Sequence, residues 1–354
     1  MKLRDYVIRR LLLLIPVFLG VSLITFALTR AVGDPASIYI SDKCDDQCAA
    51  AIREKYGFDQ PVPVQYAKYM WGMLVEGDLG YSRIATRPVA LAISEKFMAT
   101  AELATATMIL SVVVGIPLGV ISATRRNKAI DHVTRVFALS GVSVPVFWLG
   151  LMLKITFYFG TIGLLGYSLL PVTGRYSTSP VVMYGPPLGG FPVEARTGFY
   201  TLDAILGGSL DGLLDALSHL ILPTVTLTFV TMALITRMMR SSMLEVMGQE
   251  YIKTARSKGL SEKVVIDKHA RRNALIPTTT VIGLSFGGLL GGAVLTEYVF
   301  DWPGLGQWTA AAVPGLDSAA IMGFTLLAAV VYVVANLIVD ILYAILDPRI
   351  RLGE

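Results

Sequence analysis

The sequence predicts an all-α polytopic membrane protein with about six transmembrane helices, on the basis of its composition and its long apolar runs. Of 354 residues, 54% are hydrophobic and 16% are charged, whereas a soluble domain carries about 25% charged residues. The mean hydropathy is +0.63. A helix needs about 20 apolar residues to cross a hydrocarbon core of ~30 Å. Six runs approach this length, at residues 11–29, 101–123, 137–165, 220–235, 277–295 and 319–346.

The distribution of lysine and arginine predicts the orientation. These residues gather before the first run, between the second and third, between the fourth and fifth, and after the sixth. If every run crosses once, all four segments lie on one side, and the positive-inside rule makes that side cytoplasmic. The loop at 300–318 contains Asp301 and Asp317 but no lysine or arginine, as expected of an external loop. We therefore expect a multi-pass protein of the cell (inner) membrane with both termini cytoplasmic, and no nucleic-acid partner.

The first run has the basic residues before it that a signal peptide also has. The apolar region of a signal peptide is usually about 7–15 residues long and is followed by a small-residue cleavage site. This run is longer and leads to Thr29 and Arg30 without such a site. Residues 1–30 are therefore predicted to form an uncleaved amino-terminal transmembrane helix.

Two longer segments are predicted to lie outside the membrane. Residues 31–99 mix charged and apolar residues, which is typical of a small extracytoplasmic helical cap. Residues 166–218 are rich in glycine and proline, as at 184–190, and are predicted to form an irregular external loop. Helical spacing of leucine and isoleucine over 202–217 indicates a helix lying along the membrane surface. The membrane core then comprises residues 100–354.

Both cysteines, Cys44 and Cys48, fall in the predicted cap. An i,i+4 pair is near the upper end of workable disulfide separation, and an external compartment permits oxidation. A local disulfide is favoured, and two free thiols or part of a metal site are the alternatives.

Signatures of catalysis are absent or misplaced. The sequence contains no Gly-Lys dipeptide, so it has no Walker A phosphate loop. Its three histidines are far apart and lack the spacing of a zinc protease. Residues 283–287 match the G-x-S-x-G nucleophile pattern but lie inside an apolar run, where a nucleophile elbow cannot form. Gly283, Gly287 and Gly291 are instead spaced for close helix packing in lipid.

Three charged residues, Lys154, Glu297 and Asp340, fall in or at the ends of apolar runs. Charges there are costly, so each is expected to have a role. A structural placement is favoured over contact with substrate for all three. No chain of acidic residues crosses successive runs, and no internal repeat is visible, which disfavours a proton-driven secondary transporter.

The most informative segment is the basic stretch at 241–276. Helical spacing places Tyr251, Ile252 and Ala255 on one face of a helix, with lysines and arginines around them. Gly259 can then end this helix in the left-handed conformation, and a second amphipathic helix leads into the fifth run. From the residues alone, a handle for a cytoplasmic partner and a basic loop resting on anionic lipid are both open.

Two blocks in this segment carry a resemblance to a known family. One, at 251–260, reads Tyr-Ile-Lys-Thr-Ala-Arg-Ser-Lys-Gly-Leu, and the other, at 269–277, reads His-Ala-Arg-Arg-Asn-Ala-Leu-Ile-Pro. Both resemble the coupling segment of ABC-importer permeases, in the form used by the dipeptide/oligopeptide permease family. Similar motifs follow in order along the chain, at 56–61, 77–80, 145–150, 170–175, 219–223, 297–300 and 303–306. The cap motifs resemble those of the B-type inner-membrane subunit.

The resemblance implies a type I ABC importer transmembrane domain, embedded in the lipid bilayer, with three kinds of partner. These are a second, C-type permease, two ABC ATPase subunits and an extracytoplasmic solute-binding protein. ATP and Mg would be bound by the ATPase subunits, while this chain would bind no cofactor and catalyse no reaction. The residues implied to couple to an ATPase are Glu250, Tyr251, Lys253, Thr254, Ala255, Arg256, Lys258 and Gly259.

Alternatives remain open for the transported cargo and for the class of transporter. Peptides are the cargo that the resemblance favours, and oligosaccharides or another small solute are the alternative. A stand-alone channel or secondary transporter is the competing class, and co-purification of ATP-binding chains would separate it from an importer subunit.

Overall fold

The computed structural model describes residues 3–32, 36, 40, 44–177 and 197–346. The Gly/Pro-rich stretch predicted at 184–190 lies outside the described residues. The long helices are α1 (Leu3–Val32), α4 (Val89–Thr124), α5 (Ala129–Ser143), α10 (Leu210–Met247), α13 (Arg271–Leu290) and α16 (Ser318–Leu346). The shorter elements are α2 (Asp46–Tyr56), α3 (Val62–Trp71), α6 (Val146–Ile155), α7 (Thr161–Leu165), α9 (Tyr200–Leu206), α11 (Glu250–Ser257), α12 (Glu262–Val264), α14 (Val294–Val299) and α15 (Leu305–Ala312), the π-helical turns η2 (Gly72–Glu76), η3 (Thr156–Gly160) and η5 (Val265–Ala270), and the strands β1 (Tyr81–Ser82) and β2 (Arg87–Pro88).

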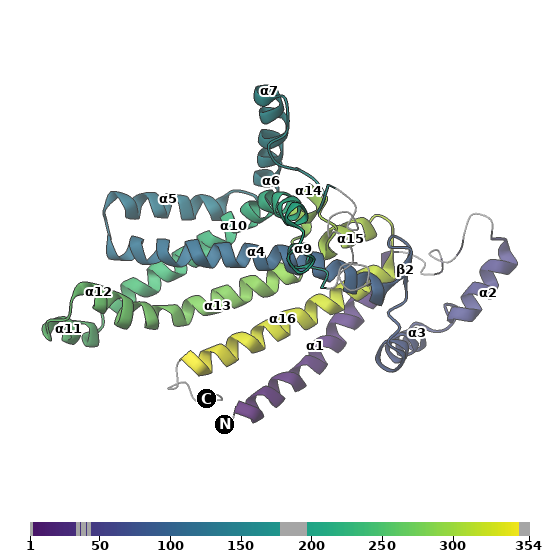
Figure 1. Ribbon diagram of the computed structural model, residues 1–354. Coiled ribbons are helices and arrows are strands. Elements are labelled where there is room, and N and C mark those ends of the chain that lie inside the picture. Colours follow the sequence, from purple (N-terminus) through teal and green to yellow (C-terminus); the bar gives the residue numbers. More distant parts are fainter. Residues whose placement is uncertain (1–2, 33–35, 37–39, 41–43, 178–196, 347–354) are drawn as a thin grey trace.

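Within the described part, five helical segments are long and apolar enough to cross a membrane. They are Val89–Thr124, Val146–Leu165, Leu210–Met247, Glu262–Leu290 and Ser318–Leu342. The first helix, α1, adds a shorter apolar segment, Ile15–Ala31. Figure 1 shows α4, α5, α10, α13, α16 and α1 running roughly along one axis. We call the end that carries α11 and α12 the elbow end, and the end that carries α2, α3, α14, α15 and the strands the cap end (Figure 1).

Small residues let α4 and α5 pack closely against α10. A Cβ atom at Gly119 of α4 would lie 2.6 Å from the Cβ of Met239, and Gly141 of α5 approaches α10 equally closely. Such close approach gives helices their van der Waals contact in lipid, where apolar side chains alone provide little drive to associate. The Oγ1 of Thr236 also donates a hydrogen bond to the carbonyl of Gly115, at 3.2 Å. As a result, α10 is the most enclosed of the five candidate spans.

The third predicted run, 137–165, is wrong as a single helix. Val144 precedes Pro145 and is extended, with φ −80° and ψ 126°, because a residue before proline avoids the helical region. The first part of the run therefore belongs to α5, which packs beside α4 and α10. The second part starts a new helix that continues through α6, η3 and α7. Figure 1 shows this helix leaving the bundle at a steep angle.

The helix α10 starts before and ends after the fourth predicted run, 220–235. Ser209 caps its start, since the Oγ accepts a hydrogen bond from the N–H of Gly212, at 3.1 Å. The segment 202–217 is helical as predicted but is not one helix, because its first part forms α9 and its second part forms the first turns of α10. Asp211 lowers the hydropathy there, which hid the true start of the helix.

The fifth predicted run, 277–295, also has different limits. Its helix begins well upstream of Pro277, through α12 and η5, and ends at Leu290. Gly292 follows with a positive φ of 104° and turns the chain into α14, a backbone conformation that a residue with a Cβ rarely adopts.

Two of the three glycines predicted to pack helices do so between α13 and α16. A Cβ at Gly283 would clash with Cγ2 of Val339, and a Cβ at Gly287 would lie 2.5 Å from the Cβ of Ala335. Gly291 lies outside this contact, because it is the residue that ends α13. The serine between the first two glycines therefore lies on a packed membrane helix and not at a nucleophile elbow.

The cap is mostly helical, but it includes a short sheet that the all-α prediction omitted. Asp45 caps α2 by accepting a hydrogen bond from the N–H of Cys48, at 2.9 Å. Cys44 and Cys48 form a disulfide at the start of this helix, with Cα atoms 5.4 Å apart. Strands β1 and β2 pair in antiparallel fashion, with Tyr81 opposite Pro88.

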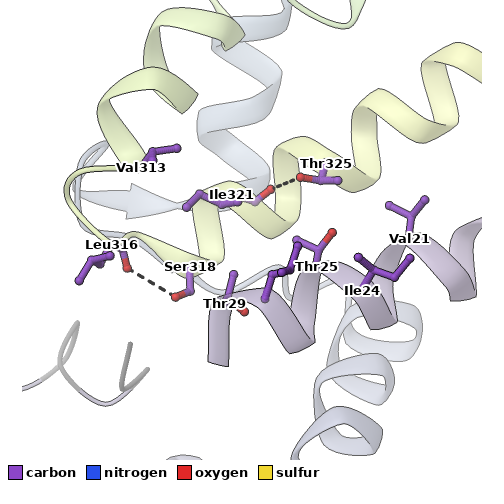
Figure 2. Close-up of a pocket in the computed structure, with 10 residues that line it drawn as sticks. Val21, Ile24, Thr25, Thr29, Val313, Leu316, Ser318, Ile321 and Thr325 are labelled. Atoms are coloured by element: carbon purple, nitrogen blue, oxygen red, sulfur yellow. Dashed lines mark hydrogen bonds between the residues drawn. The ribbon is translucent and has the colours of Figure 1, made fainter. Parts of the chain in front are cut away.

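The helices α1 and α16 lie side by side near the cap end and leave a groove of about 540 Å³ between them (Figure 2). The groove has threonine hydroxyls in its wall, and these donate hydrogen bonds within their own helices; Thr29 also reaches the sulfur of Met322 in α16, at 3.7 Å. Thr29 Oγ1 donates to the carbonyl of Phe26 at 2.9 Å, and Thr325 Oγ1 donates to the carbonyl of Ile321 at 2.7 Å. The surface that the groove presents is therefore largely apolar.

Candidate coupling site

The predicted coupling segment forms an elbow at one end of the bundle, which Figure 1 shows projecting beyond the α4–α5 turn. The chain leaves α10, forms α11, and returns through α12 and η5 into α13. The elbow, residues 248–270, thus joins two candidate membrane spans directly. Through this connection α11 is attached to both α10 and α13.

One face of α11 packs into the bundle. Ile252 is fully buried and Ala255 nearly so, in an apolar cluster with Met243 of α10, Val265 of η5 and Ala274 of α13. Burial of a large aliphatic side chain contributes about 1.5–3 kcal/mol. The elbow is therefore a packed extension of the bundle rather than a free loop.

The end of α11 is fixed by the turn predicted at Gly259, which has a φ of 78°. The N–H of Gly259 donates to the carbonyl of Arg256 at 2.9 Å, and the N–H of Leu260 donates to the carbonyl of Ala255 at 3.4 Å. This pair of bonds is the Schellman arrangement, which requires a left-handed residue where the helix ends. The prediction that Gly259 ends the helix in this conformation is confirmed.

The other face of α11 is polar and exposed. Lys253 pairs with Glu250 at 2.7 Å, and Arg256 pairs with Glu262 at the start of α12, also at 2.7 Å. Hydrogen bonds to Glu262 raise the pKa of Arg256 above its already high ordinary value, so this side chain stays charged. Exposed ion pairs contribute little to stability. Their main consequence is a set of solvent-exposed charges at the tip of the elbow.

The structure therefore divides the eight predicted coupling residues into two groups. Ala255 faces the apolar cluster of its own chain and is not available to a partner. The other seven are exposed: Glu250, Tyr251, Lys253, Thr254, Arg256, Lys258 and Gly259. Tyr251, predicted on the same face as Ile252 and Ala255, lies at the border and accepts a hydrogen bond from Asn273 of α13, at 3.0 Å.

A buried ion pair that the sequence analysis missed fastens the α4–α5 turn to α10. Arg240 donates from Nε to Oδ1 of Asp131 at 2.7 Å and from Nη2 to Oδ2 at 3.0 Å. Asp131 is fully buried and also accepts hydrogen bonds from Ser122 Oγ at 2.6 Å and the N–H of Asn127 at 3.0 Å. Full satisfaction of a buried carboxylate fixes the helices that supply the donors. The sequence signal that could have indicated this ion pair was Asp131, an acidic residue that closely follows Arg125, Arg126 and Lys128.

A second missed ion pair lies at the cap end, between Glu102 of α4 and Arg175. The two side chains are 4% and 5% exposed. Arg175 Nε donates to Glu102 Oε2 at 3.0 Å, and the guanidinium stacks 3.9 Å from the ring centroid of Tyr200. Glu102 Oε1 accepts from the N–H and the hydroxyl of Thr201, at 2.8 and 2.7 Å. The pair thus attaches α9 and the residues after α7 to α4.

Two of the three charged residues for which a structural role was predicted, Glu297 and Lys154, bond to other parts of the same chain. Glu297 is fully buried and accepts hydrogen bonds from Thr100 Oγ1 at 2.8 Å and from two N–H groups at the start of α15. Burial raises the pKa of Glu297, and these hydrogen bonds oppose the rise. Lys154 Nζ donates to the carbonyl of Val299 at 2.8 Å, at the negative end of α14. Asp340 lies half-buried in α16.

Two family models match this chain. Residues 115–352 match the model of the binding-protein-dependent transport system inner membrane component. Residues 3–104 match the model of the N-terminal part of such a membrane component.

Curated relatives match over nearly the whole length. The probable D,D-dipeptide transport system permease protein DdpB of Escherichia coli K12 is 43% identical over 342 residues, covering 96% of this chain and 95% of its own. The dipeptide transport system permease protein DppB of the same organism is 41% identical over 349 residues, or 98% of both chains. The oligopeptide transport system permease protein AppB of Bacillus subtilis is 37% identical over 348 residues, covering 98% and 99%. This chain therefore belongs to the family of binding-protein-dependent transport system inner membrane components.

Proposed function

We propose that this chain is the B-type permease subunit of an ATP-driven importer and that α11 is the element through which an ATPase subunit acts on it. The observation that carries the proposal is the division of α11 into two faces. Ile252 and Ala255 attach it to the bundle, while the opposite face presents exposed charges. A helix that only rested on lipid would need its apolar face for the membrane, and here the bundle already occupies that face.

The proposed mechanism follows from the connections of α11. In the full assembly, two ATPase subunits bind ATP and Mg in the cytoplasm, where the positive-inside rule places the elbow. Closure of the ATPase pair displaces α11. Because the apolar cluster joins α11 to Met243 of α10 and Ala274 of α13, both spans move with it as a rigid unit. Together with a C-type permease, this motion alternates the pathway between its two faces.

The proposed cargo is a short peptide delivered by an extracytoplasmic solute-binding protein. The support is that the three relatives described above are named for transport of D,D-dipeptides, dipeptides and oligopeptides. In such systems the binding protein does most of the selecting, so the identity of the cargo is best read from the ligand it retains. Mass spectrometry of a binding protein that associates with this chain should find a peptide, and an oligosaccharide or another solute there would overturn the peptide assignment.

The coupling role is tested by reversing charge on the exposed face alone. The double variant Lys253→Glu/Lys258→Glu should insert normally but lose ATPase subunits on purification and lose most uptake of a labelled dipeptide. Arg126→Glu is the matched control, because it reverses an exposed charge in the α4–α5 turn, away from α11. Unchanged uptake in the double variant would refute the role of α11, and uptake by this chain without any ATPase subunit would favour a secondary transporter.

A further inference from the structure

A pocket of about 540 Å³ lies between α5 and α10 toward the elbow end. Arginines dominate its polar wall: Arg135 comes from α5, and Arg237 and Arg240 come from α10. The apolar part of the wall includes Val136 and Leu139 of α5. Neither the coupling role of α11 nor the family match accounts for this pocket.

The positive charge in the pocket exceeds what its carboxylate can balance. Asp131 is fully buried and is held by Arg240, Ser122 and the backbone. Arg135 forms a longer ion pair with the same Asp131, at 3.9 Å, and donates a hydrogen bond to Nδ1 of His132 at 2.6 Å. Arg237 is exposed and makes no hydrogen bond or ion pair with any residue that the structure describes. One carboxylate therefore faces three guanidinium groups, and the positive charge left over can be balanced by an anion.

Polar and apolar groups are separated along the pocket. The helices α5 and α10 are antiparallel, since Asp131 at the start of α5 meets Arg240, and Gly141 near its end meets Ala233. Along α5, Arg135 comes first and Leu139 follows one turn farther from the elbow end. Charge thus lies at the elbow end and apolar surface toward the middle of the bundle, which is the order of groups in a phospholipid of the leaflet on that side.

We propose that this pocket binds one anionic phospholipid, with its phosphate against Arg135 and Arg237 and an acyl chain along Val136 and Leu139. Basic pockets between transmembrane helices on the cytoplasmic side suit anionic headgroups. Val136 and Leu139 are 65% and 68% exposed in this chain and need an apolar cover. A bound lipid would rest against the Asp131–Arg240 pair and hold α5 to α10 beside the elbow. The proposal does not depend on the coupling role of α11.

The test is retention of phosphatidylglycerol by the full-length chain, purified with its accompanying subunits and placed in nanodiscs of phosphatidylcholine containing a minor fraction of phosphatidylglycerol. Native mass spectrometry after release should find phosphatidylglycerol bound to the wild type. The variant Arg135→Gln/Arg237→Gln should bind it roughly 30-fold more weakly, as expected for two basic side chains. The matched control Arg125→Gln/Arg126→Gln removes two exposed charges outside the pocket and should bind normally. Equal retention by both variants would overturn the proposal.

A second readout keeps the test decisive if the variant folds poorly. Leu139→Cys, which leaves both arginines in place, should be labelled by a phosphatidylglycerol that carries a thiol-reactive group at mid-chain. The same lipid should not label Val133→Cys, a residue of α5 that is equally exposed but does not line the pocket. If Leu139→Cys forms a cross-link to the partner permease instead, the pocket is a protein interface and the lipid assignment is wrong.

Discussion

Two ion pairs, Glu102–Arg175 at the cap end and Glu250–Lys253 in the elbow, place similar charged side chains in opposite environments. At the cap end, the Glu102–Arg175 pair is 4% and 5% exposed, and the carboxylate of Glu102 accepts hydrogen bonds from Arg175 and Thr201. At the elbow, the Glu250–Lys253 pair is 85% and 62% exposed. Breaking a buried pair leaves an uncompensated charge in the protein, whereas breaking an exposed pair leaves both charges in water.

The two regions differ in which contacts stabilise them and in which side chains they leave on the surface. Loops at the cap end are attached by buried polar contacts, and those contacts are not free to serve another molecule. The elbow is attached by apolar contacts of Ile252 and Ala255, so its charges remain on the surface. An end built in this way can exchange its polar partners without losing its own fold.

The largest effect is expected from breaking the buried pair. Glu102→Ala leaves Arg175 buried without its carboxylate and should lower the free energy of unfolding by about 3–5 kcal/mol. Glu95→Ala, in the same helix, breaks an exposed pair with Arg87 and should lower it by less than about 1 kcal/mol. Chemical or thermal unfolding in detergent measures both. Similar losses for the two variants would contradict the contrast between buried and exposed pairs.

A smaller loss is expected at the elbow, from its apolar face alone. Ile252→Ala should destabilise the packing of α11 by about 2–5 kcal/mol, because it leaves a cavity among Met243, Val265 and Ala274. Amide exchange in α11 and α12 should rise accordingly. Lys253→Ala should leave that exchange unchanged while weakening association with the ATPase subunits. Faster exchange in the lysine variant would show that the polar face also holds the elbow in place.

An effect of intermediate size is expected at two adjacent glycines of α13, where substitution by alanine should destabilise the protein at one position and stabilise it at the other. Gly287→Ala places a methyl group against Ala335, which cannot rotate away, and should destabilise the α13–α16 contact by about 1–3 kcal/mol. Gly288→Ala meets no atom within 4 Å and should stabilise the helix by about 0.5–1 kcal/mol. Thermal unfolding of the two variants side by side measures the difference, and a loss in both would indicate that the second face of α13 is also packed.

The smallest effect is expected for the ion pair between α11 and α12. Arg256→Ala should change the free energy of unfolding by less than about 1 kcal/mol, because both Arg256 and Glu262 are exposed. The wild type should approach the variant as salt is raised, since salt screens exposed pairs. A large loss that salt does not reduce would mean that this pair, and not the apolar cluster, holds the elbow.

The features that follow from local chemistry could be predicted from the sequence. Gly259 ends α11 because only a residue tolerant of positive φ fits there, and the apolar runs mark most of the candidate spans. Hydropathy alone does not register where a helix changes direction, so the break at Pro145 was missed. It also underestimates helices that continue beyond an apolar run into more polar sequence, which is why α10 is much longer than the run at 220–235.

The buried ion pairs join residues that are far apart in the chain, and they could not be predicted from local sequence patterns. Glu102 and Arg175 are joined only by the fold, and no spacing rule connects them. Ala255 shows the same limit within the candidate site. Its motif marked it as a coupling residue, but the sequence did not show that it packs against its own bundle.

The account rests on the claim that the exposed face of α11 meets an ATPase subunit, and cross-linking tests that claim most directly. Lys253→Cys in the complete assembly should cross-link to an ATPase subunit, with a yield that changes when ATP closes the ATPase pair. Arg126→Cys, an exposed position in the α4–α5 turn, is the control and should give little product. No cross-link from Lys253→Cys, or its labelling by a membrane-impermeant reagent from outside the cell, would contradict the account.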